Sequence, residues 1–532
     1  MTPKKIPSPA EFIAEALKKY AGKKLLIDAK TGTSLTYGDL DLLTKRSANL
    51  IRSFGIKRGN VVSLLLNNSL SFFTPWLGAV MTGASVHLIS TLSTAERVAY
   101  ETDLCETKLL VSEARFAKVI EEAGINNRKN IRIIYLEEFL KKLAEFPGSL
   151  DKTDYGSNDQ FQLICTSGTT GKPKAVVQHN GMVWPDIQAV INAYELSGDD
   201  VTLLVNRLFH VNAQYMSFLP MLVLGGKVVV SEKFEPELFW QSIKAQKITY
   251  SSLVPPANIM LLKHLPMNKS DYASLKFFIF GADVLTAEDH KNFVKTTGVA
   301  VKQVWGMTET GCAGSASPPN EPVVFGSIGK PIAGAEMMVV DPENGWRELP
   351  ANKIGRLIFK GPMSFREYLK NNEATIKTFA PGNGFFDTGD LCYKDSDGNF
   401  FFVDRASLSF KLKGEYVRPW DITNVIKRID GIEDAFVHFL TEANGDKAIF
   451  ACVVWKDKPL KTPQDVWRYV DGERGKPNGI DWNFKVKYVI FIPKILVGAA
   501  KRDMNSIKEL TAKRVGGENI PGWEEMFADE KS

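Results

Sequence analysis

Cysteine and histidine are scarce in this chain of 532 residues, which has five cysteines and six histidines. The cysteines are odd in number, lie far apart and form no C-x-x-C pair; they are Cys105, Cys165, Cys312, Cys392 and Cys452. This pattern argues against a disulfide framework and predicts reduced, mostly buried thiols in a cytoplasmic protein. The first residues also lack the apolar segment and cleavage site of a secretory signal.

Neither sign of charge dominates, and long apolar runs are missing. The 66 Lys and Arg residues against 61 Asp and Glu give a net charge of +5 without a long basic run, which argues against a nucleic-acid partner. Residues 59–95 carry no charged side chain, yet Asn67, Asn68, Pro75 and His87 interrupt them. We therefore expect a buried core segment there and no integral membrane segment.

Short apolar runs alternate with amphipathic helical patterns through most of the chain, and this alternation predicts an α/β fold with parallel sheets. The predicted strands are 61–66, 85–89, 108–111, 131–135, 161–165, 201–205, 227–231 and 277–280. Short strands and turns from Gly326 to Asp404 predict a small β-barrel-like subdomain. A compact α+β pattern follows, so we expect a large N-terminal domain over 1–404 and a small mobile domain over 405–532. The tail from Val515 is expected to be loosely ordered.

The most informative segment is 161–180, FQLICTSGTTGKPKAVVQHN, in which an apolar strand leads into a loop of glycines, hydroxyls and lysines. Glycine lets the backbone approach an anion, hydroxyl and amide groups donate to phosphate oxygens, and lysine supplies positive charge. A Walker A loop is excluded because Pro173 follows Lys172, where Ser or Thr is needed. A flexible solvent loop is the alternative. The candidate phosphate-binding residues are Thr166, Ser167, Gly168, Thr169, Thr170, Gly171, Lys172 and Lys174.

The string TSGTTGKPK at 166–174 resembles the signature of the adenylate-forming enzymes, which include acyl-CoA synthetases, luciferases and the adenylation domains of peptide synthetases. Further matches follow in the family's order: WGMTET at 305–310, GSIGKPIAG at 326–334, FFDTGDL at 385–391 and VDRASLSFKLKGEYVRP at 403–419. The resemblance covers nearly the whole chain. It implies an acid–thiol ligase that uses ATP, Mg²⁺ and coenzyme A, forming first an acyl-adenylate and then an acyl-CoA thioester.

The same resemblance implies how the nucleotide is held. Trp305 takes the position of the usual tyrosine and is expected to lie against the adenine ring. Thr308 would donate to the α-phosphate, and Glu309 would bind a Mg²⁺ ion that bridges phosphate oxygens. By itself Glu309 could equally be a solvated surface carboxylate. The other residues that these motifs assign to the nucleotide are Gly281, Ala282, Asp283, Gly306 and Met307.

Three further positions follow from the later motifs. Asp390 resembles the carboxylate that accepts both ribose hydroxyls, and Arg405 the guanidinium that contacts ribose or phosphate. A turn aspartate and a surface arginine are the alternatives. Gly414 lies on the loop that the resemblance assigns to the pantetheine tunnel.

The acyl side has a weaker signal. The segment NRLFHVNAQ at 206–214 resembles the family's P-x-F-H segment, in which His210 borders the carboxylate pocket, although Arg207 replaces the usual proline. A satisfied core histidine is the alternative. Residues 254–257 are expected in the pocket wall. The wording of these segments is most similar to carnitine-CoA ligases and the fatty-acid transport group, which suggests an aliphatic or carnitine-like carboxylic acid and a place in fatty-acid metabolism.

One departure from the family pattern concerns the C-terminal catalytic lysine. The corresponding run, IPKILVGAAKRDM at 492–504, has Ala499 after Gly498, where the family has lysine. Loss of one positive group aimed at an anionic transition state costs ~3–4 kcal/mol in comparable sites. Three interpretations stay open: Lys501 or Lys494 substitutes, a natural or engineered change has impaired adenylation, or the protein works chiefly in the thioester-forming half-reaction.

Two other functions therefore stay open beside the CoA ligase. The first is an adenylating enzyme that transfers the acyl group to a phosphopantetheine carrier protein or an amine. The second is a catalytically impaired relative that binds a nucleotide or an acyl group, which Ala499 suggests.

Overall fold

The computed structural model describes residues 6–528 apart from 152, 154, 167–172, 284, 408, 413–414, 418, 442–446, 477–479, 481–483, 494–503, 517–519 and 521–522. The chain has an α/β fold and divides into two compact units. The first unit comprises Met1–Met338, Ile358–Thr388 and Lys394–Phe401, and the second comprises Val339–Leu357, Gly389–Tyr393 and Phe402–Ser532. The expected boundary between residues 404 and 405 stays a prediction.

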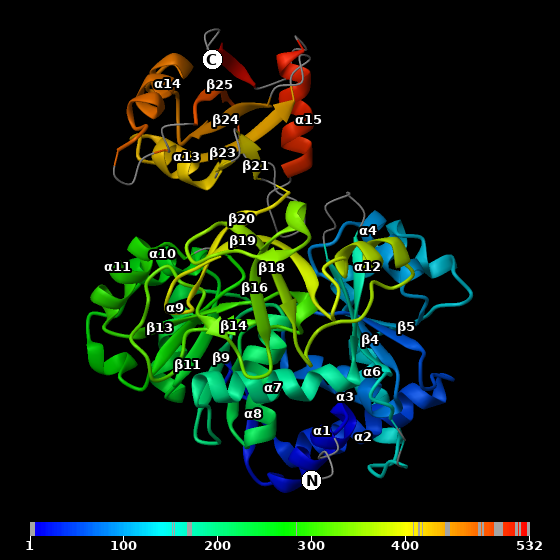
Figure 1. The fold of residues 1–532 in the computed structure, drawn as a ribbon. Coiled ribbons are helices and arrows are strands. Elements are labelled where there is room, and N and C mark those ends of the chain that lie inside the picture. The colour runs from blue at the N-terminus through cyan, green and yellow to red at the C-terminus, as the bar shows by residue number, and fades with distance from the viewer. Residues whose placement is uncertain are drawn as a thin grey trace. The chain divides into compact units, whose positions relative to one another are not determined.

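A nine-stranded sheet forms one layer of the first unit, in the order β15-β14-β13-β12-β11-β9-β10-β1-β2. Its six central strands, β13-β12-β11-β9-β10-β1, pair in parallel with one another, whereas β1 pairs antiparallel with β2 and β13 with β14. The strands are β1 (Lys24–Asp28), β2 (Ser34–Thr36), β9 (Val201–Leu204), β10 (Lys227–Val230), β11 (Tyr250–Leu253), β12 (Phe277–Phe280), β13 (Ala300–Trp305), β14 (Ser315–Ala316) and β15 (Lys330–Pro331). Figure 1 shows α9 (Pro236–Gln246), α10 (Pro256–Lys263) and α11 (Ala287–Thr297) in green beside this sheet.

A six-stranded sheet of order β6-β5-β3-β4-β7-β8 forms the other large layer of this unit. Its strands are β3 (Val61–Leu65), β4 (Ser85–Leu88), β5 (Thr107–Ser112), β6 (Arg132–Tyr135), β7 (Gln160–Thr166) and β8 (Lys174–His179). All neighbours pair in parallel except β7 and β8, which pair antiparallel. The strands predicted from the sequence at 61–66, 85–89, 108–111, 131–135 and 161–165 are confirmed here.

The helices of the first unit begin and end where local chemistry directs. In α2 (Tyr37–Ser53), Thr36 and Asp39 satisfy the first backbone N–H groups reciprocally as a capping box. The charge-free stretch at 59–95 supplies β3, β4 and the buried helix α3 (Phe73–Thr82), so it is core, as predicted. The remaining helices are α1 (Pro9–Lys19), α4 (Ala95–Leu104), α5 (Ala117–Glu122), α6 (Leu136–Lys142), α7 (Asn180–Tyr194), α8 (Leu219–Leu224) and α12 (Asn372–Thr378).

A five-stranded sheet occupies the region where the sequence predicts a small barrel-like subdomain. Its order is β17-β16-β18-β19-β20. The strands are β16 (Glu336–Asp341), β17 (Arg347–Glu348), β18 (Gly355–Lys360), β19 (Phe386–Lys394) and β20 (Phe400–Arg405).

The second unit contains a four-stranded sheet of order β23-β24-β25-β26 and a small β21-β22 hairpin. The strands are β21 (Phe410–Leu412), β22 (Glu415–Val417), β23 (Ile432–Thr441), β24 (Lys447–Trp455), β25 (Val486–Phe491) and β26 (Glu524–Ala528), and the helices are α13 (Pro419–Lys427), α14 (Pro463–Gly472) and α15 (Met504–Val515). The expectation of a loose tail is wrong, because β26 pairs antiparallel with β25 and Trp523 is buried before it.

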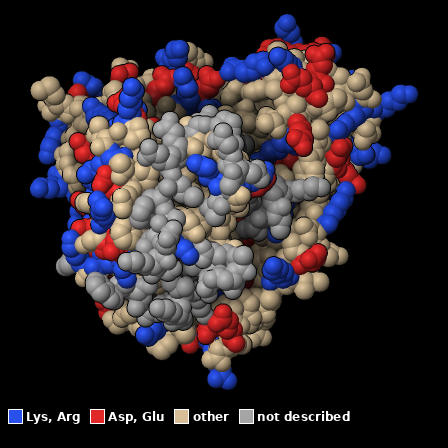
Figure 2. Space-filling view, turned by 90° about the horizontal axis from the view of Figure 1, so that it is seen from above, with Lys and Arg blue, Asp and Glu red and all other residues tan. Residues whose placement is uncertain are grey.

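Surface charge is mixed in the part of the chain that is described. Figure 2 shows Lys and Arg interspersed with Asp and Glu over one face. Among the described residues, no helix combines the length and apolar character needed to cross a bilayer.

Candidate active site

The predicted site segments of the first unit meet at one edge of the nine-stranded sheet. His210 comes after β9, residues 281–283 follow β12, and Trp305 ends β13. Because β9, β11, β12 and β13 are parallel, the segments that follow them leave from the same edge. This is the edge at which open α/β sheets bind their ligands.

Backbone geometry at 281–283 brings the chain close to β13. A Cβ on Gly281 would lie 2.9 Å from the Val304 carbonyl oxygen, so glycine is needed here. Ala282 adopts φ +68°, a left-handed conformation that is costly for a residue with a Cβ. Ala282 and Asp283 are exposed. This segment is therefore a fixed and accessible turn at the carboxyl end of β12.

The 305–310 motif forms a tight turn after β13. Trp305 is 7% exposed and its ring lies 6.2 Å from that of Phe359. A Cβ on Gly306 would overlap the carbonyl oxygen of Cys312, so no larger residue fits without a backbone shift. The Met307 N–H donates to Thr310 Oγ1 at 3.0 Å. These contacts fix the direction in which residues 308–310 leave the sheet.

Glu309 is only 5% exposed, so it is not the surface carboxylate that the isolated residue suggested. The Tyr368 hydroxyl donates to Glu309 Oε1 at 2.8 Å, and the Lys174 ammonium lies 5.1 Å from the centre of the Tyr368 ring. Burial and the neighbouring Glu309 charge raise the pKa of Tyr368 far above its usual range, so its hydroxyl keeps its proton. The Tyr368 side chain thus contacts both Lys174, through its ring, and Glu309, through its hydroxyl.

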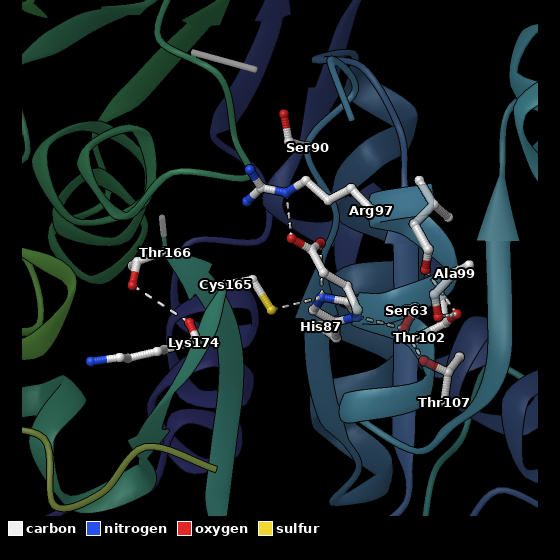
Figure 3. A network of polar contacts seen from close by, with 12 residues as sticks. Ser63, His87, Ser90, Arg97, Ala99, Thr102, Thr107, Cys165, Thr166 and Lys174 are labelled. Atoms are coloured by element: carbon white, nitrogen blue, oxygen red, sulfur yellow. Dashed lines mark hydrogen bonds and ion pairs between the residues drawn. The ribbon is translucent and has the colours of Figure 1, made fainter. Parts of the chain in front are cut away.

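The ends of the predicted phosphate loop are held together by β7 and β8. Thr166 pairs with Lys174 across the hairpin, and the Thr166 hydroxyl donates to the Lys174 carbonyl at 3.5 Å (Figure 3). The Lys174 side chain points away from this bond in the same view. The predicted residues Ser167, Gly168, Thr169, Thr170, Gly171 and Lys172 lie outside the described residues.

A buried chain of amides joins three of these segments. Gln178 on β8 donates from Nε2 to the carbonyls of Thr308 and Gly311, both at 3.0 Å. Its Oε1 accepts from Gln162 Nε2 at 2.7 Å, and the same Gln162 nitrogen donates to Gln214 Oε1 at 2.8 Å. Gln214 in turn donates to the Leu208 carbonyl at 2.8 Å. The β7–β8 hairpin, the 308–311 turn and the 206–214 segment are therefore positioned by shared hydrogen bonds.

His210 is exposed, which rules out the core-histidine alternative. The His210 ring lies 4.4 Å from that of Phe209, and the backbone N–H of His210 donates to the Arg207 carbonyl at 2.9 Å. The Arg207 side chain, which stands where the family has proline, donates to the Glu232 carbonyl at 2.9 Å. This hydrogen bond therefore connects the 206–214 segment to the chain at Glu232.

In the second unit, Asp390 and Arg405 come together. Asp390 is 1% exposed, and its Oδ1 lies 2.8 Å from Arg405 Nη1. Asp390 lies buried within β19, so it is not a turn aspartate, whereas the Arg405 side chain is 42% exposed and the surface alternative stays open for it. Burial and the nearby Asp390 and Asp421 charges raise the pKa of Asp404 to about 6, against hydrogen bonds from Arg405 and Ser409. The predicted residues Gly414, Ala499 and Lys501 lie outside the described residues.

Sequence reasoning missed the residues that support the predicted ones, chiefly Tyr368 and Gln178. Tyr368 lies outside the quoted motifs, and Gln178 lies in the 161–180 segment but beyond the TSGTTGKPK string, where a lone glutamine carries no signal of its own. The donor set at 308–309 is a carboxylate and a hydroxyl, which are hard oxygen ligands that suit Mg²⁺.

Known proteins resemble the chain over most of its length. Residues 13–369 match the AMP-binding enzyme family. The chain is 30% identical to 4-coumarate–CoA ligase 5 of Oryza sativa subsp. japonica, covering 95% of this chain and 94% of the relative. It is also 30% identical to 4-coumarate–CoA ligase 1 of Arabidopsis thaliana, covering 95% and 92%.

Solved structures agree on the fold. ATP-bound MatB from Rhodopseudomonas palustris superposes with a TM-score of 0.85 at 23% identity, covering 95% of this chain and 99% of MatB. The o-succinylbenzoate CoA synthetase MenE from Bacillus subtilis, in complex with ATP and magnesium ion, superposes with a TM-score of 0.81 at 21% identity, covering 93% and 99%. The fold is that of the adenylate-forming enzymes. The chain belongs to the AMP-binding enzyme family.

Proposed function

We propose that the protein is an AMP-forming acid–thiol ligase, which joins a carboxylic acid to coenzyme A at the expense of ATP. The observation that carries the proposal is the buried Glu309 carboxylate, held by Tyr368 beside Lys174 at the end of the phosphate hairpin. The curated relatives named above are CoA ligases, which supports the same activity.

The residues suggest how the first half-reaction proceeds. The carboxylate oxygen of the acid attacks the α-phosphorus of ATP, and the bond to pyrophosphate breaks. Thr166, Lys174 and Thr308 would orient the phosphates, with Lys174 drawing negative charge toward the hairpin. When bound at Glu309, Mg²⁺ supplies charge neutralisation at the phosphate oxygens. Trp305 and the 281–283 turn would hold the adenine, and Asp390 with Arg405 the ribose.

The second half-reaction makes the thioester. The sulfur of CoA attacks the acyl carbon of the adenylate and AMP leaves, so a poor electrophile has first been converted into a mixed anhydride. Gly414 would line the route of the pantetheine arm. Transfer to a carrier protein or an amine is the alternative for this step, and only the acceptor differs.

For the acid, we propose an apolar carboxylate bound beside His210, of the aliphatic or carnitine-like type that the segment wording suggests. Val254 and Pro256, at the expected pocket wall, are exposed at the end of β11. The 4-coumarate ligases among the relatives make hydroxycinnamates the second class to test.

The test is pyrophosphate release by the full chain with Mg·ATP and a panel of acids from acetate to palmitate, carnitine-like acids and hydroxycinnamates, with and without CoA. Release that depends on one acid and is accelerated by CoA is expected. If CoA does not accelerate pyrophosphate release but a carrier protein or an amine does, the acceptor is that alternative and not CoA.

The variant Ala499→Lys separates an impaired enzyme from a binding protein. If the unaltered chain releases no pyrophosphate and Ala499→Lys does, the adenylation site is intact and lacks only its lysine. Silence of both, with ATP still bound, would refute the ligase. Glu309→Gln is the matched control and should abolish release in any active background.

A further inference from the structure

A buried cluster of potential metal ligands lies beside the hairpin that carries the phosphate loop. The cluster consists of His87 on β4, Cys105 directly after α4 and Cys165 near the end of β7; one nitrogen and two sulfur atoms of these residues all lie within 4.8 Å of one another. Glu101 on α4 adds an oxygen, since its Oε2 lies 3.6 Å from His87 Nε2. We propose that His87, Glu101, Cys105 and Cys165 bind one Zn²⁺ ion as a closed structural site.

Two of the six separations between the ligand atoms fit tetrahedral coordination. Bond lengths of ~2.3 Å to sulfur and ~2.0 Å to nitrogen or oxygen require ligand atoms ~3.6 Å apart for sulfur and nitrogen and ~3.3 Å apart for nitrogen and oxygen. The Cys165 Sγ lies 3.8 Å from His87 Nε2, and the Glu101 oxygen lies 3.6 Å from the same nitrogen. Both separations match the required edges within a few tenths of an ångström.

The outer contacts orient the ligands as they do in known zinc sites. His87 Nδ1 is 2.9 Å from Ser63 Oγ, which also bonds Thr107 Oγ1 at 2.7 Å, so the other ring nitrogen faces the thiols. Figure 3 shows His87 between Ser63 and Cys165. Arg97 Nε donates to Glu101 Oε1 at 2.7 Å, which leaves the second carboxylate oxygen directed at His87. Such partners fix ring orientation and carboxylate geometry in metal sites.

Charge also balances. On binding, each thiol loses its proton to solvent and its sulfur lone pair forms the bond to the ion, so no oxidant or reductant is needed. Two thiolates and Glu101 carry three negative charges, and Zn²⁺ with Arg97 carries three positive charges. His87 and Glu101 are almost completely buried, and a buried charge is tolerated when it is paired or coordinates a metal.

The ion would tie β4, α4 and β7 together one residue before Thr166, where the phosphate hairpin leaves the sheet. Because all four ligands come from the protein, the site has no open position for a substrate and is structural. This role is independent of the ligase activity proposed above.

Cobalt substitution tests the site in the full chain. The protein, stripped of metal by a chelator under reducing conditions, is titrated with Co²⁺ and its absorption recorded. We expect one Co²⁺ per chain, tetrahedral ligand-field bands and a thiolate-to-cobalt charge-transfer band, all displaced by Zn²⁺. Binding without the charge-transfer band, or no binding, would overturn the proposal, and this result depends on no variant.

Variants locate the ion. Cys105→Ser should lose the charge-transfer intensity of one thiolate, and Ser63→Ala should weaken zinc affinity by ~10–100-fold through the His87 ring. Cys452→Ser is the matched control, because Cys452 Sγ lies 3.9 Å from His438 Nε2 in the second unit and its other partner is the Thr511 hydroxyl. An unchanged spectrum in Cys105→Ser, or its loss in Cys452→Ser, would refute the assignment. A Cys105–Cys165 disulfide in the metal-free protein purified without reductant, with no metal uptake after its reduction, would refute it as well.

Discussion

The bond between Tyr368 and Glu309 permits a quantitative prediction for Tyr368→Phe. The substitution removes the hydroxyl that donates to a buried carboxylate at 2.8 Å and keeps the ring beneath Lys174. A hydrogen bond to a charged group contributes ~1.5–3 kcal/mol, and its loss here leaves Glu309 short of a donor in a buried place. We expect the free energy of unfolding of the first unit to fall by ~2 kcal/mol.

The same variant should weaken catalysis if Glu309 binds the metal of Mg·ATP. A loss of ~2 kcal/mol in transition-state stabilisation corresponds to ~30-fold in kcat/KM, measured by pyrophosphate release over a range of Mg·ATP. Tyr368→Leu also removes the ring and with it the cation–π contact with Lys174. Transition-state stabilisation should therefore fall by a further ~0.5–2 kcal/mol.

Tyr272→Phe is the matched control, because the Tyr272 hydroxyl donates to an uncharged carbonyl, that of Thr297, at 3.3 Å in the same unit. Its unfolding free energy should fall by only ~1 kcal/mol, and pyrophosphate release should not change. The reasoning is refuted if Tyr368→Phe matches the unaltered protein in urea unfolding and kinetics, or if Tyr272→Phe loses as much activity.

Three further predictions concern other parts of the chain. Gly306→Ala should destabilise the first unit by ~1–3 kcal/mol through overlap with Cys312 and abolish ATP binding by calorimetry, whereas Gly22→Ala, with nothing within 4 Å of its Cβ, should leave both unchanged. Gln178→Leu removes the side-chain donor from the carbonyls of Thr308 and Gly311, of which the Thr308 carbonyl keeps the Gly311 N–H at 3.2 Å. Urea unfolding should therefore show a loss of ~1–3 kcal/mol, and wild-type stability would contradict the amide chain. Burial lowers the pKa of His438 to about 4, so the second unit should keep this contribution above pH ~6.5 and lose up to ~3 kcal/mol as the pH falls toward 4; a His438→Gln variant with the same acid slope would contradict this.

The alternation of apolar runs with helical patterns was sufficient to predict most of the large unit. The strand at 277–280 is β12 with identical bounds, because hydrophobic periodicity acts locally. The loose tail was a wrong prediction for the opposite reason. The residues of β26 show no strong pattern, and the strand exists because β25 offers a free edge supplied by distant sequence.

The site residues likewise fall into those that a sequence motif indicates and those that only the fold brings into place. Motif residues such as Glu309 could be singled out because their spacing is specific; the role of Glu309 stays a prediction, and the structure adds that this carboxylate is buried. Tyr368 could not, because its role depends on a contact across 59 positions of sequence. The cluster around His87 was also invisible, since its two thiols come from positions 105 and 165 and only the fold of β4, α4 and β7 brings them together.

The amide chain through Gln162, Gln178 and Gln214 has a consequence for how this protein can diverge. Each amide presents its donors on one side and its acceptor on the other, so the orientation of one side chain dictates that of the next. Rotating Gln178 by half a turn would set its oxygen against the carbonyls of Thr308 and Gly311. A relative that changes one of these glutamines therefore has to change its neighbours as well. Among related sequences, substitutions at the three positions should therefore occur together.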